Sequence, residues 1–454
     1  MQIKIIETNV IVPSSPPFTD DHFLQLTHLD NDPNLRVTFR YVRAYHNTNS
    51  SPSPSNPSHV ISAAISAALV DYYPLAATIR SRPDRRFEVV CSNGQGVPLI
   101  IASADSTLDS VGYLDDPAAD FVEHLAPDPN PEEAMSTPCM LQLTVFNCGG
   151  FTLGAAIHHS LCDGMGATQF FNAAAEFARG ATRASVEPVW DRAGLLRPRD
   201  PPRIGAPVLH ECLSLDKGFP PYGQAEAVGP VVRECFHVRD EWVEKFKGEL
   251  LEQSGLNFTT FEALGAFIWR AKIKAIGLPS DEKVTFAYSI NVRRLVTPAL
   301  PASYWGNGCV PMYVNLTATE LTSKPLSSVA DLIKKSKSNA TDEYVRSFID
   351  FQELHYEDGI TAGKEVSGFT DWRHLRHSSV DFGWGGPVTV LPLSRNLLGS
   401  VEPCFFLPPS SSSAGVGKKD GFKVLVTMRE SAVPAFREEM EKFGCLEGDL
   451  LSRI

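Results

Sequence analysis

The sequence lacks both an apolar run long enough to cross a bilayer and a surplus of positive charge. A transmembrane helix needs about 20 apolar residues, and no apolar window of about 18 occurs. The formal net charge is −12 over 454 residues. This balance disfavours nucleic acid and anionic membrane surfaces as partners, because binding to phosphate requires local positive charge. An acidic surface weakly favours a cationic small molecule, although solubility is the commoner reason for it.

Paired cysteines and a secretion signal are also missing. The nine cysteines stand singly, which gives neither a disulfide framework nor a zinc or redox motif. The start, MQIKIIETNVIVPSSPP, alternates apolar and polar residues like an edge strand and has no apolar signal core. The last residues, SRI, match the S-K-L peroxisomal address poorly. We therefore expect a cytoplasmic protein in a reducing compartment.

The composition favours a soluble protein with two domains. Hydrophobic residues make up 43% and charged residues 21% of the chain, as in ordinary globular proteins. The length is about three times that of a typical domain. A stretch dense in proline and charge, with Trp190 and Leu196 as anchoring points, separates two halves. We expect an N-terminal domain, a crossover and a C-terminal domain over residues 1–189, 190–230 and 231–454.

Apolar periodicity predicts helices and strands in irregular alternation, with no fixed-period repeat. Helices are expected over residues 60–71, 164–179, 261–276 and 328–348. Strands are expected over residues 141–147, 151–157, 284–290, 310–314 and 422–426. Thr259 and Glu262 have the spacing of a capping box for the third helix. Segments 47–58 and 408–421, rich in Ser, Pro and Gly, are typical of exposed loops.

Residues 158–164, HHSLCDG, lie between a predicted buried strand and a predicted helix. A histidine such as His159 has an ordinary pKa of about 6.5 and can accept a proton from a nucleophile at neutral pH. Gly164 allows the backbone to approach a neighbour closely. A buried structural histidine is the commoner reading of such a turn. A metal site using His159 and Asp163 lacks a third ligand nearby, and Ser160 lacks the G-x-S-x-G setting of a hydrolase nucleophile.

A second motif, DFGWG, occupies residues 381–385. Alone, an aromatic and glycine pentad is typical of a tight, packed turn. In this order, the two motifs closely resemble the BAHD family of plant acyltransferases, in which HxxxDG and DFGWG are the signature pair. Four further segments, YPLA, NVRR, YWGN and TDWR, are similar to family segments and lie at residues 73–76, 291–294, 304–307 and 370–373.

The resemblance implies an α/β fold with mixed sheets, arranged as two chloramphenicol-acetyltransferase-like domains with a solvent channel between them. His159 would be the general base midway along the channel. Asp163 would point away from the substrate and pair with an arginine, for which Arg293 is the matching position. The DFGWG turn would be chiefly structural, with a further role for its tryptophan in placing the donor or the tetrahedral intermediate. The residues concerned are Asp381, Gly383, Trp384 and Gly385.

The resemblance also implies acyl-CoA as a co-substrate, with no bound cofactor or metal. The chain looks most like the branch of spermidine hydroxycinnamoyltransferases and of taxane and benzyl-alcohol acyltransferases. We therefore expect hydroxycinnamoyl transfer from CoA to an amine of spermidine or a related polyamine. O-acylation of an alcohol from a benzoyl, acetyl or hydroxycinnamoyl donor is the alternative, and a non-catalytic acyl-CoA or small-molecule binding protein is a third reading. A carrier-dependent condensation domain is disfavoured by the DFGWG motif.

Carboxylates in the acceptor mouth would bind the distal ammonium groups of a polyamine. Asp371 is the candidate we select, since it lies ten residues before Asp381. The other carboxylates available by type are Asp350, Glu353, Glu357 and Asp358. No apolar heptad suggests self-association, and we expect a monomer.

Overall fold

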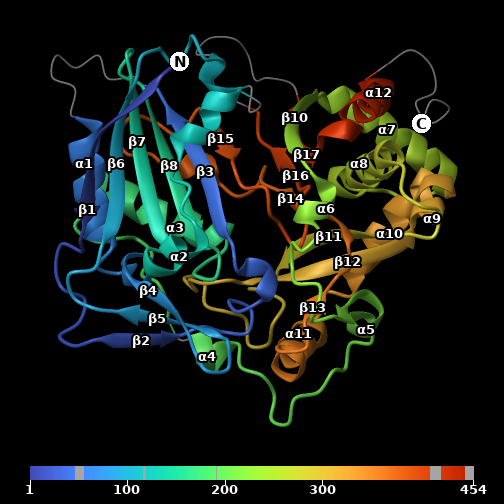
Figure 1. Ribbon diagram of the computed structural model, residues 1–454, viewed down its shortest axis with the longest axis horizontal. Helices are drawn as coiled ribbons and strands as arrows, with labels where there is room; N and C mark the ends of the chain where they lie inside the picture. The colour runs from blue at the N-terminus through green and yellow to red at the C-terminus, as the bar shows by residue number, and fades with distance from the viewer. Residues whose placement is uncertain (47–55, 116–118, 191, 410–420, 445–454) are drawn as a thin grey trace.

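The computed structural model describes residues 1–46, 56–115, 119–190, 192–409 and 421–444, and builds them around two six-stranded sheets (Figure 1). In spatial order the N-terminal sheet is β1 (Ile3–Ile11), β6 (Val97–Ala104), β7 (Cys139–Phe146), β8 (Phe151–His158), β3 (Thr38–Tyr45) and β15 (Thr389–Pro392). The C-terminal sheet is β10 (Val231–Val238), β17 (Phe422–Arg429), β16 (Cys404–Leu407), β14 (Glu365–Asp371), β11 (Lys283–Asn291) and β12 (Cys309–Thr317). Both sheets mix parallel and antiparallel pairs, as the expected fold class requires.

Two smaller sheets lie beside these. One is β2 (His22–Gln25), β5 (Phe87–Cys91) and β4 (Thr78–Ser81), and the other is β9 (Ser214–Leu215) with β13 (Ile360–Thr361). Short 3-10 helices are η1 (Pro33–Leu35), η2 (Tyr73–Ala76), η3 (Gly112–Leu114), η4 (Asp120–Leu125), η5 (His377–Ser379) and η6 (Glu430–Ala432).

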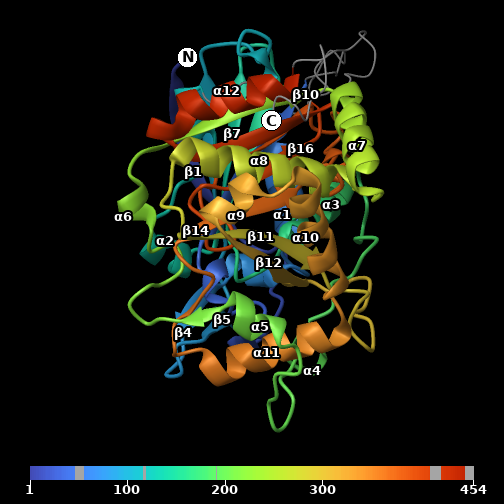
Figure 2. The same ribbon diagram turned by 90° about the vertical axis from the view of Figure 1, so that its right-hand side faces the viewer.

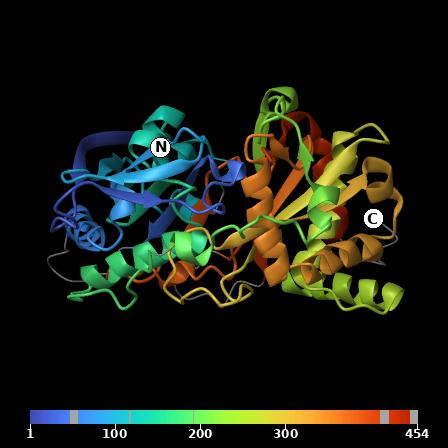
Figure 3. The same ribbon diagram turned by 90° about the horizontal axis from the view of Figure 1, so that it is seen from below.

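The helices cover the two large sheets separately. Those of the N-terminal half are α1 (Pro57–Ala68), α2 (Pro131–Ser136) and α3 (Gly164–Ala178). The crossover carries α4 (Arg192–Leu195), α5 (Val208–Cys212) and α6 (Ala225–Val228). The C-terminal half has α7 (Asp240–Ser254), α8 (Thr260–Ile276), α9 (Ala318–Ser323), α10 (Leu326–Ser338), α11 (Asp342–His355) and α12 (Val433–Gly444). Figure 2 looks onto the helices of the C-terminal half, and Figure 3 shows the two halves side by side.

The hairpin that ends at the histidine motif forms as its sequence predicts. Every residue of β8 is buried, which explains the unbroken apolar run in place of an alternating pattern. β7 pairs antiparallel with β8 through the turn at Gly149, whose φ is 79°. Glycine accommodates this left-handed backbone without strain. The rigid hairpin thus fixes where the chain leaves the sheet at His158.

Helix α8 begins as predicted, whereas the expected helix over residues 328–348 is wrong. The hydroxyl of Thr259 accepts from the backbone of Glu262, and the Glu262 carboxylate accepts from the backbone of Thr259. The charged segment, by contrast, divides into α10 and α11. The hydroxyl of Thr341 accepts a hydrogen bond from the Tyr344 amide at 3.2 Å and starts α11. Such a side chain competes with the helical backbone and ends a continuous helix.

Strand β15 lies in the N-terminal sheet, although it follows residue 231 in sequence. It pairs antiparallel with β3, from Thr389 opposite Ala44 to Pro392 opposite Tyr41. Without it, β3 would present an open edge. The segment that carries DFGWG therefore crosses to the N-terminal half. By residue number, β15 was expected in the domain over residues 231–454.

The crossover is held by the anchors that its sequence suggested. Trp190 packs between the rings of Tyr73 and Trp305, with centroid distances of 5.0 and 5.1 Å, and Leu196 is fully buried. The predicted loops over 47–58 and 408–421 fall mostly outside the described residues. Within the described residues, no helix is both long and apolar enough to span a bilayer, and the cysteines are free thiols.

Candidate active site

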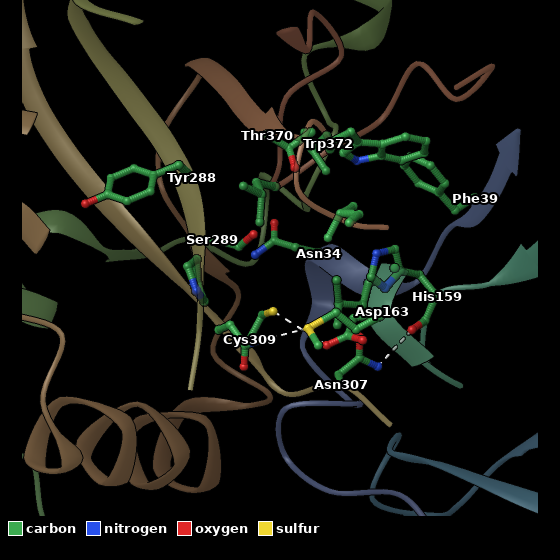
Figure 4. Close-up of a pocket in the computed structure, with 18 of the residues that line it drawn as sticks. Asn34, Phe39, His159, Asp163, Tyr288, Ser289, Asn307, Cys309, Thr370 and Trp372 are labelled. Atoms are coloured by element: carbon green, nitrogen blue, oxygen red, sulfur yellow. Dashed lines mark hydrogen bonds between the residues drawn. The ribbon is translucent and has the colours of Figure 1, made fainter. Parts of the chain in front are cut away.

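A cavity of about 460 Å³ lies between the two large sheets and is lined from both halves of the chain. Strand β3 and the end of β8 line one side, and β11, β12 and β14 line the other. Figure 4 shows side chains from both halves converging on it, among them Phe39, His159, Tyr288, Ser289, Thr370 and Trp372. The cavity occupies the position where a channel between the domains was expected.

His159 stands directly after β8 and is half-buried at the cavity wall. Its backbone is held on both sides, since its amide donates to the Val37 carbonyl at 2.8 Å and its carbonyl accepts from Nδ2 of Asn307 at 2.9 Å (Figure 4). The ring of Phe39 meets the imidazole edge-on at 5.8 Å. Nδ1 of His159 is buried, with no hydrogen-bond partner in any other described residue. The backbone is therefore fixed while the ring lies at the cavity.

Burial sets the protonation state of this histidine. It lowers the pKa of His159 below the ordinary value, while the residue's own backbone carbonyl and the charge of Asp163 oppose the shift. The imidazole is therefore neutral at neutral pH and can accept a proton.

Asp163 lies at the cavity wall and joins the two halves. Its Oδ1 accepts from the Gly166 amide at 2.9 Å and so caps α3. The Arg293 guanidinium forms a bidentate pair with it, with Nη1 2.7 Å from Oδ2 and Nη2 3.0 Å from Oδ1. The Gly308 amide donates to Oδ2 at 3.0 Å. Burial alone would raise the pKa of Asp163, but the Arg293 charge and these hydrogen bonds outweigh it and bring the pKa to about 2.

Gly308 is needed at its position for a steric reason. A Cβ there would lie 2.5 Å from Nη1 and 2.6 Å from Cζ of Arg293. A side chain would therefore displace the guanidinium from Asp163.

A second buried ion pair, which the sequence did not indicate, supports the same turn. Asp30 and Arg192 are both 0% exposed, with Oδ2 and Nη1 3.0 Å apart. Oδ1 of Asp30 accepts from the amide and the side chain of Asn307 at 2.9 and 3.0 Å. Arg192 also donates to the Leu161 carbonyl at 2.8 Å. Asp30 thus orients the side-chain amide of Asn307, which donates to the His159 carbonyl. In the sequence, Asn307 of the YWGN segment was the only sign of this network.

The DFGWG residues form a turn away from the cavity. Oδ1 of Asp381 accepts from the amides of Gly383 and Gly385 at 2.7 and 2.9 Å, and the two glycines have φ of 106° and 86°. Trp384 is buried and packs edge-on against Phe151 at 5.3 Å. Because none of Asp381, Gly383, Trp384 and Gly385 lines the cavity, their contacts fit a structural role. A contact between Trp384 and the donor stays a prediction.

Asp371, the selected acceptor residue, lines the cavity at the end of β14. Arg373 already holds it, with Nη2 2.6 Å from Oδ2 and Nε 2.9 Å from Oδ1. The other carboxylates that were available by type do not line this cavity; they are Asp350, Glu353, Glu357 and Asp358.

One cavity carboxylate was overlooked in the sequence. Asp32 lines the cavity, is 4% exposed and forms no ion pair with any described residue. Burial raises the pKa of Asp32 to about 6, against hydrogen bonds from the amide and side chain of Asn34. In the described part of the chain, no group of three or more His, Cys, Asp and Glu side chains could hold a metal ion.

The two domains, with a cavity between them, have the chloramphenicol-acetyltransferase-like fold that was expected. The chain matches the model of the Transferase family over residues 1–443. It therefore belongs to this family of BAHD acyltransferases.

Named relatives span both nitrogen and oxygen acceptors. The chain is 30% identical to the spermidine sinapoyl-CoA acyltransferase of Arabidopsis thaliana, with 97% of each chain covered. It is 31% identical to the taxadien-5-alpha-ol O-acetyltransferase of Taxus chinensis, also over 97% of each. Among solved structures, F. graminearum TRI101 complexed with ethyl coenzyme A has a TM-score of 0.76 at 15% identity, covering 93% of this chain and 98% of that one. The protein is thus an acyl-CoA-dependent acyltransferase.

Proposed function

We propose that this acyltransferase moves a hydroxycinnamoyl group from CoA to an amine of spermidine or a related polyamine, with His159 as the general base. The observation that carries the proposal is a neutral imidazole on a cavity that both domains line. The spermidine sinapoyl-CoA acyltransferase among the relatives supports the choice of donor and acceptor.

In this scheme His159 takes a proton from the acceptor nitrogen as the nitrogen attacks the thioester carbonyl. A tetrahedral intermediate forms, and its collapse breaks the carbon–sulfur bond. The imidazolium then gives its proton to the departing CoA thiolate. No acyl-enzyme is required, because the cavity holds both substrates together and supplies proximity. Asp163 and Arg293 act by holding the turn, not by touching substrate.

A polyamine must lose a proton before it attacks. An aliphatic ammonium with a pKa near 10 requires about 4–5 kcal/mol for this at pH 7. Asp32 and Asp371 both line the cavity, and their carboxylates are the groups we propose for the remaining ammonium charges. Asp32 is the stronger candidate, since it has no cationic partner among the described residues, whereas Asp371 is paired with Arg373.

O-acylation of an alcohol is the second candidate, and the pairing of Asp371 with Arg373 favours it, because that carboxylate is already neutralised. An alcohol also has no ammonium proton to lose before it attacks. The taxadienol O-acetyltransferase among the relatives acts on such an acceptor.

A substrate matrix separates these candidates. Acetyl-, benzoyl-, coumaroyl- and feruloyl-CoA are each incubated with spermidine, putrescine and aromatic alcohols, and products are measured by mass spectrometry. We expect hydroxycinnamoyl amides to dominate, and Asp32→Asn to raise the KM for spermidine more than Asp371→Asn does. Esters alone would replace the polyamine proposal with the alcohol one. Retained CoA-thioester binding with no product would favour a non-catalytic binding protein.

We further propose that the enzyme works as a monomer in the cytoplasm. The singly placed cysteines support a reducing compartment, and sedimentation of the purified chain tests the monomer.

A further inference from the structure

Arg43 carries a buried guanidinium that has no anionic partner. The residue is 0% exposed, and the neutral hydroxyl of Tyr41 is the nearest polar group that responds to its charge, because Arg43 opposes the rise that burial causes in the pKa of Tyr41. Among the described residues, Nε, Nη1 and Nη2 have no partner in good hydrogen-bond geometry. It lines the cavity from β3. The rings of Tyr41 and Phe171 lie 4.7 and 4.6 Å from its Cζ. Because buried charges are normally paired, this guanidinium points to a hydrogen-bonding group on a ligand.

His377 brings a hydrogen-bond acceptor to the same cavity. Its Nδ1 is 3.4 Å from the hydroxyl of Thr168, which donates its single hydrogen to the Gly164 carbonyl at 2.8 Å. This contact is satisfied when Nδ1 of His377 donates, and that tautomer has its lone pair on Nε2. That Nε2 is buried and has no partner among the described residues. Burial, and then the charge of Arg43, lowers the pKa of His377 to about 3, so the ring stays neutral.

Aromatic side chains connect this end of the cavity with the reactive histidine. The ring of Phe39 lies 5.8 Å from that of His159 and 5.6 Å from that of Trp372 (Figure 4). Trp372 in turn meets Tyr41 at 6.3 Å. Phe39 and Arg43 are four positions apart on the same face of β3, roughly 13 Å along the strand. Such a wall suits a flat aromatic substrate whose far end reaches the guanidinium.

We propose that Arg43 and His377 form a subsite for an aromatic hydroxyl of the substrate, with Arg43 donating to the hydroxyl oxygen and Nε2 of His377 accepting its hydrogen. The inference rests on the proposed acyl transfer at His159 and narrows its substrates to those that carry such a hydroxyl, on the acyl group or on the acceptor. A carboxylate would satisfy Arg43 but would face the lone pair of His377. An ammonium group would be repelled by Arg43, so a polyamine must lie elsewhere in the cavity.

Binding calorimetry on the full chain tests the subsite with two matched series. In the donor series, 4-coumaroyl-CoA is compared with cinnamoyl-CoA; in the acceptor series, 4-hydroxybenzyl alcohol is compared with benzyl alcohol. A hydrogen bond to a charged group predicts a preference of roughly 10- to 100-fold for the hydroxylated compound in one series. In Arg43→Met we expect that preference to fall below about threefold, with the plain analogue bound as before. The series that responds identifies which substrate carries the hydroxyl.

Stability gives an independent readout. Arg43→Met removes an unpaired buried charge, and we expect the Tm to rise. Arg40→Met is the matched control, on the opposite face of β3. Its guanidinium is occupied by the Glu123 carboxylate at 3.0 Å and the Pro127 carbonyl at 2.7 Å. The Tm of this control should fall, and its preference for the hydroxylated compound should equal that of the wild type.

Two results would overturn the subsite: a wild-type enzyme that binds both members of each series alike, or Arg43→Met with its preference intact. If Arg43→Met does not fold, His377→Phe carries the test, and an unchanged preference in that variant has the same meaning. Turnover of the same pairs separates the two proposals. A binding preference without acyl transfer contradicts only the proposed function, whereas transfer without preference contradicts only the subsite.

Discussion

Among single residues, the site combines a neutral imidazole, the proposed general base, with buried charges around the turn that carries it. His159 is held through its backbone by Val37 and Asn307, which leaves the ring to the cavity. The Asp163–Arg293 pair and the Asp30–Arg192 pair are both buried, and both contact the segment that follows β8. Burying charge is unfavourable unless the pairing is complete, which supports the proposed role of these residues in orienting the histidine.

Asp163→Asn tests one of these pairs. The substitution leaves Arg293 without its carboxylate, and we expect the free energy of unfolding at pH 7 to fall by about 3–5 kcal/mol, together with a loss of turnover. Urea unfolding with a CoA-dependent activity assay measures both. Equal stability of variant and wild type at pH 7 would contradict this role.

The difference in unfolding free energy between wild type and Asp163→Asn should depend on pH, because the pKa of Asp163 is lowered in the folded protein. The pKa of Asp163 is lowered to about 2, from an ordinary value of about 3.9. Its contribution is therefore fully present above about pH 4 and is lost as the pH falls towards 2. The gap between wild type and Asp163→Asn should be constant from pH 8 to 5 and shrink below pH 4.

Helices and strands form as predicted where a local sequence signal, such as a capping box or a buried apolar run, is strong. The buried hairpin of β7 and β8, the start of α3 and the capping box of α8 were all predicted from sequence. The split between α10 and α11 was missed because one threonine cap outweighed a continuous apolar pattern.

The cap of α8 can be measured directly. Thr259→Ala removes the acceptor for the Glu262 amide, and we expect a loss of about 1 kcal/mol in unfolding free energy. Thr259→Ser keeps the hydroxyl and should stay within a few tenths of a kcal/mol of wild type. Equal losses in the two variants would show that the methyl group, and not the cap, is what matters.

Across the whole molecule, contacts between distant segments could not be read from the sequence. Three features depend on residues that only the folded chain brings together. They are the pairing of β15 with β3, the Asp30–Arg192 pair and the buried guanidinium of Arg43, which has no anionic partner among the described residues. The histidine motif and DFGWG could be found because each is local. Which of the two turns lies at the cavity could be told only from the folded structure.

The position of β15 in the N-terminal sheet predicts cooperative unfolding of the two halves. Because this strand ties the C-terminal half to the N-terminal sheet, we expect one calorimetric transition for the wild-type chain. Leu391→Pro removes the backbone donor that faces Val42 of β3 and should separate the melting of the two halves, whereas Leu391→Ala keeps the donor and should melt in one step. Two transitions in the wild type would show that the halves are independent.

The most direct test of the account is the turnover of purified His159→Ala beside His374→Ala, which alters an exposed histidine outside the cavity. We predict a loss of about 10²–10⁴-fold in kcat for His159→Ala, with an unchanged Tm and with CoA-thioester binding retained, and wild-type rates for the control. Near-normal turnover in the folded His159→Ala variant would contradict the assignment of the base and the mechanism built on it.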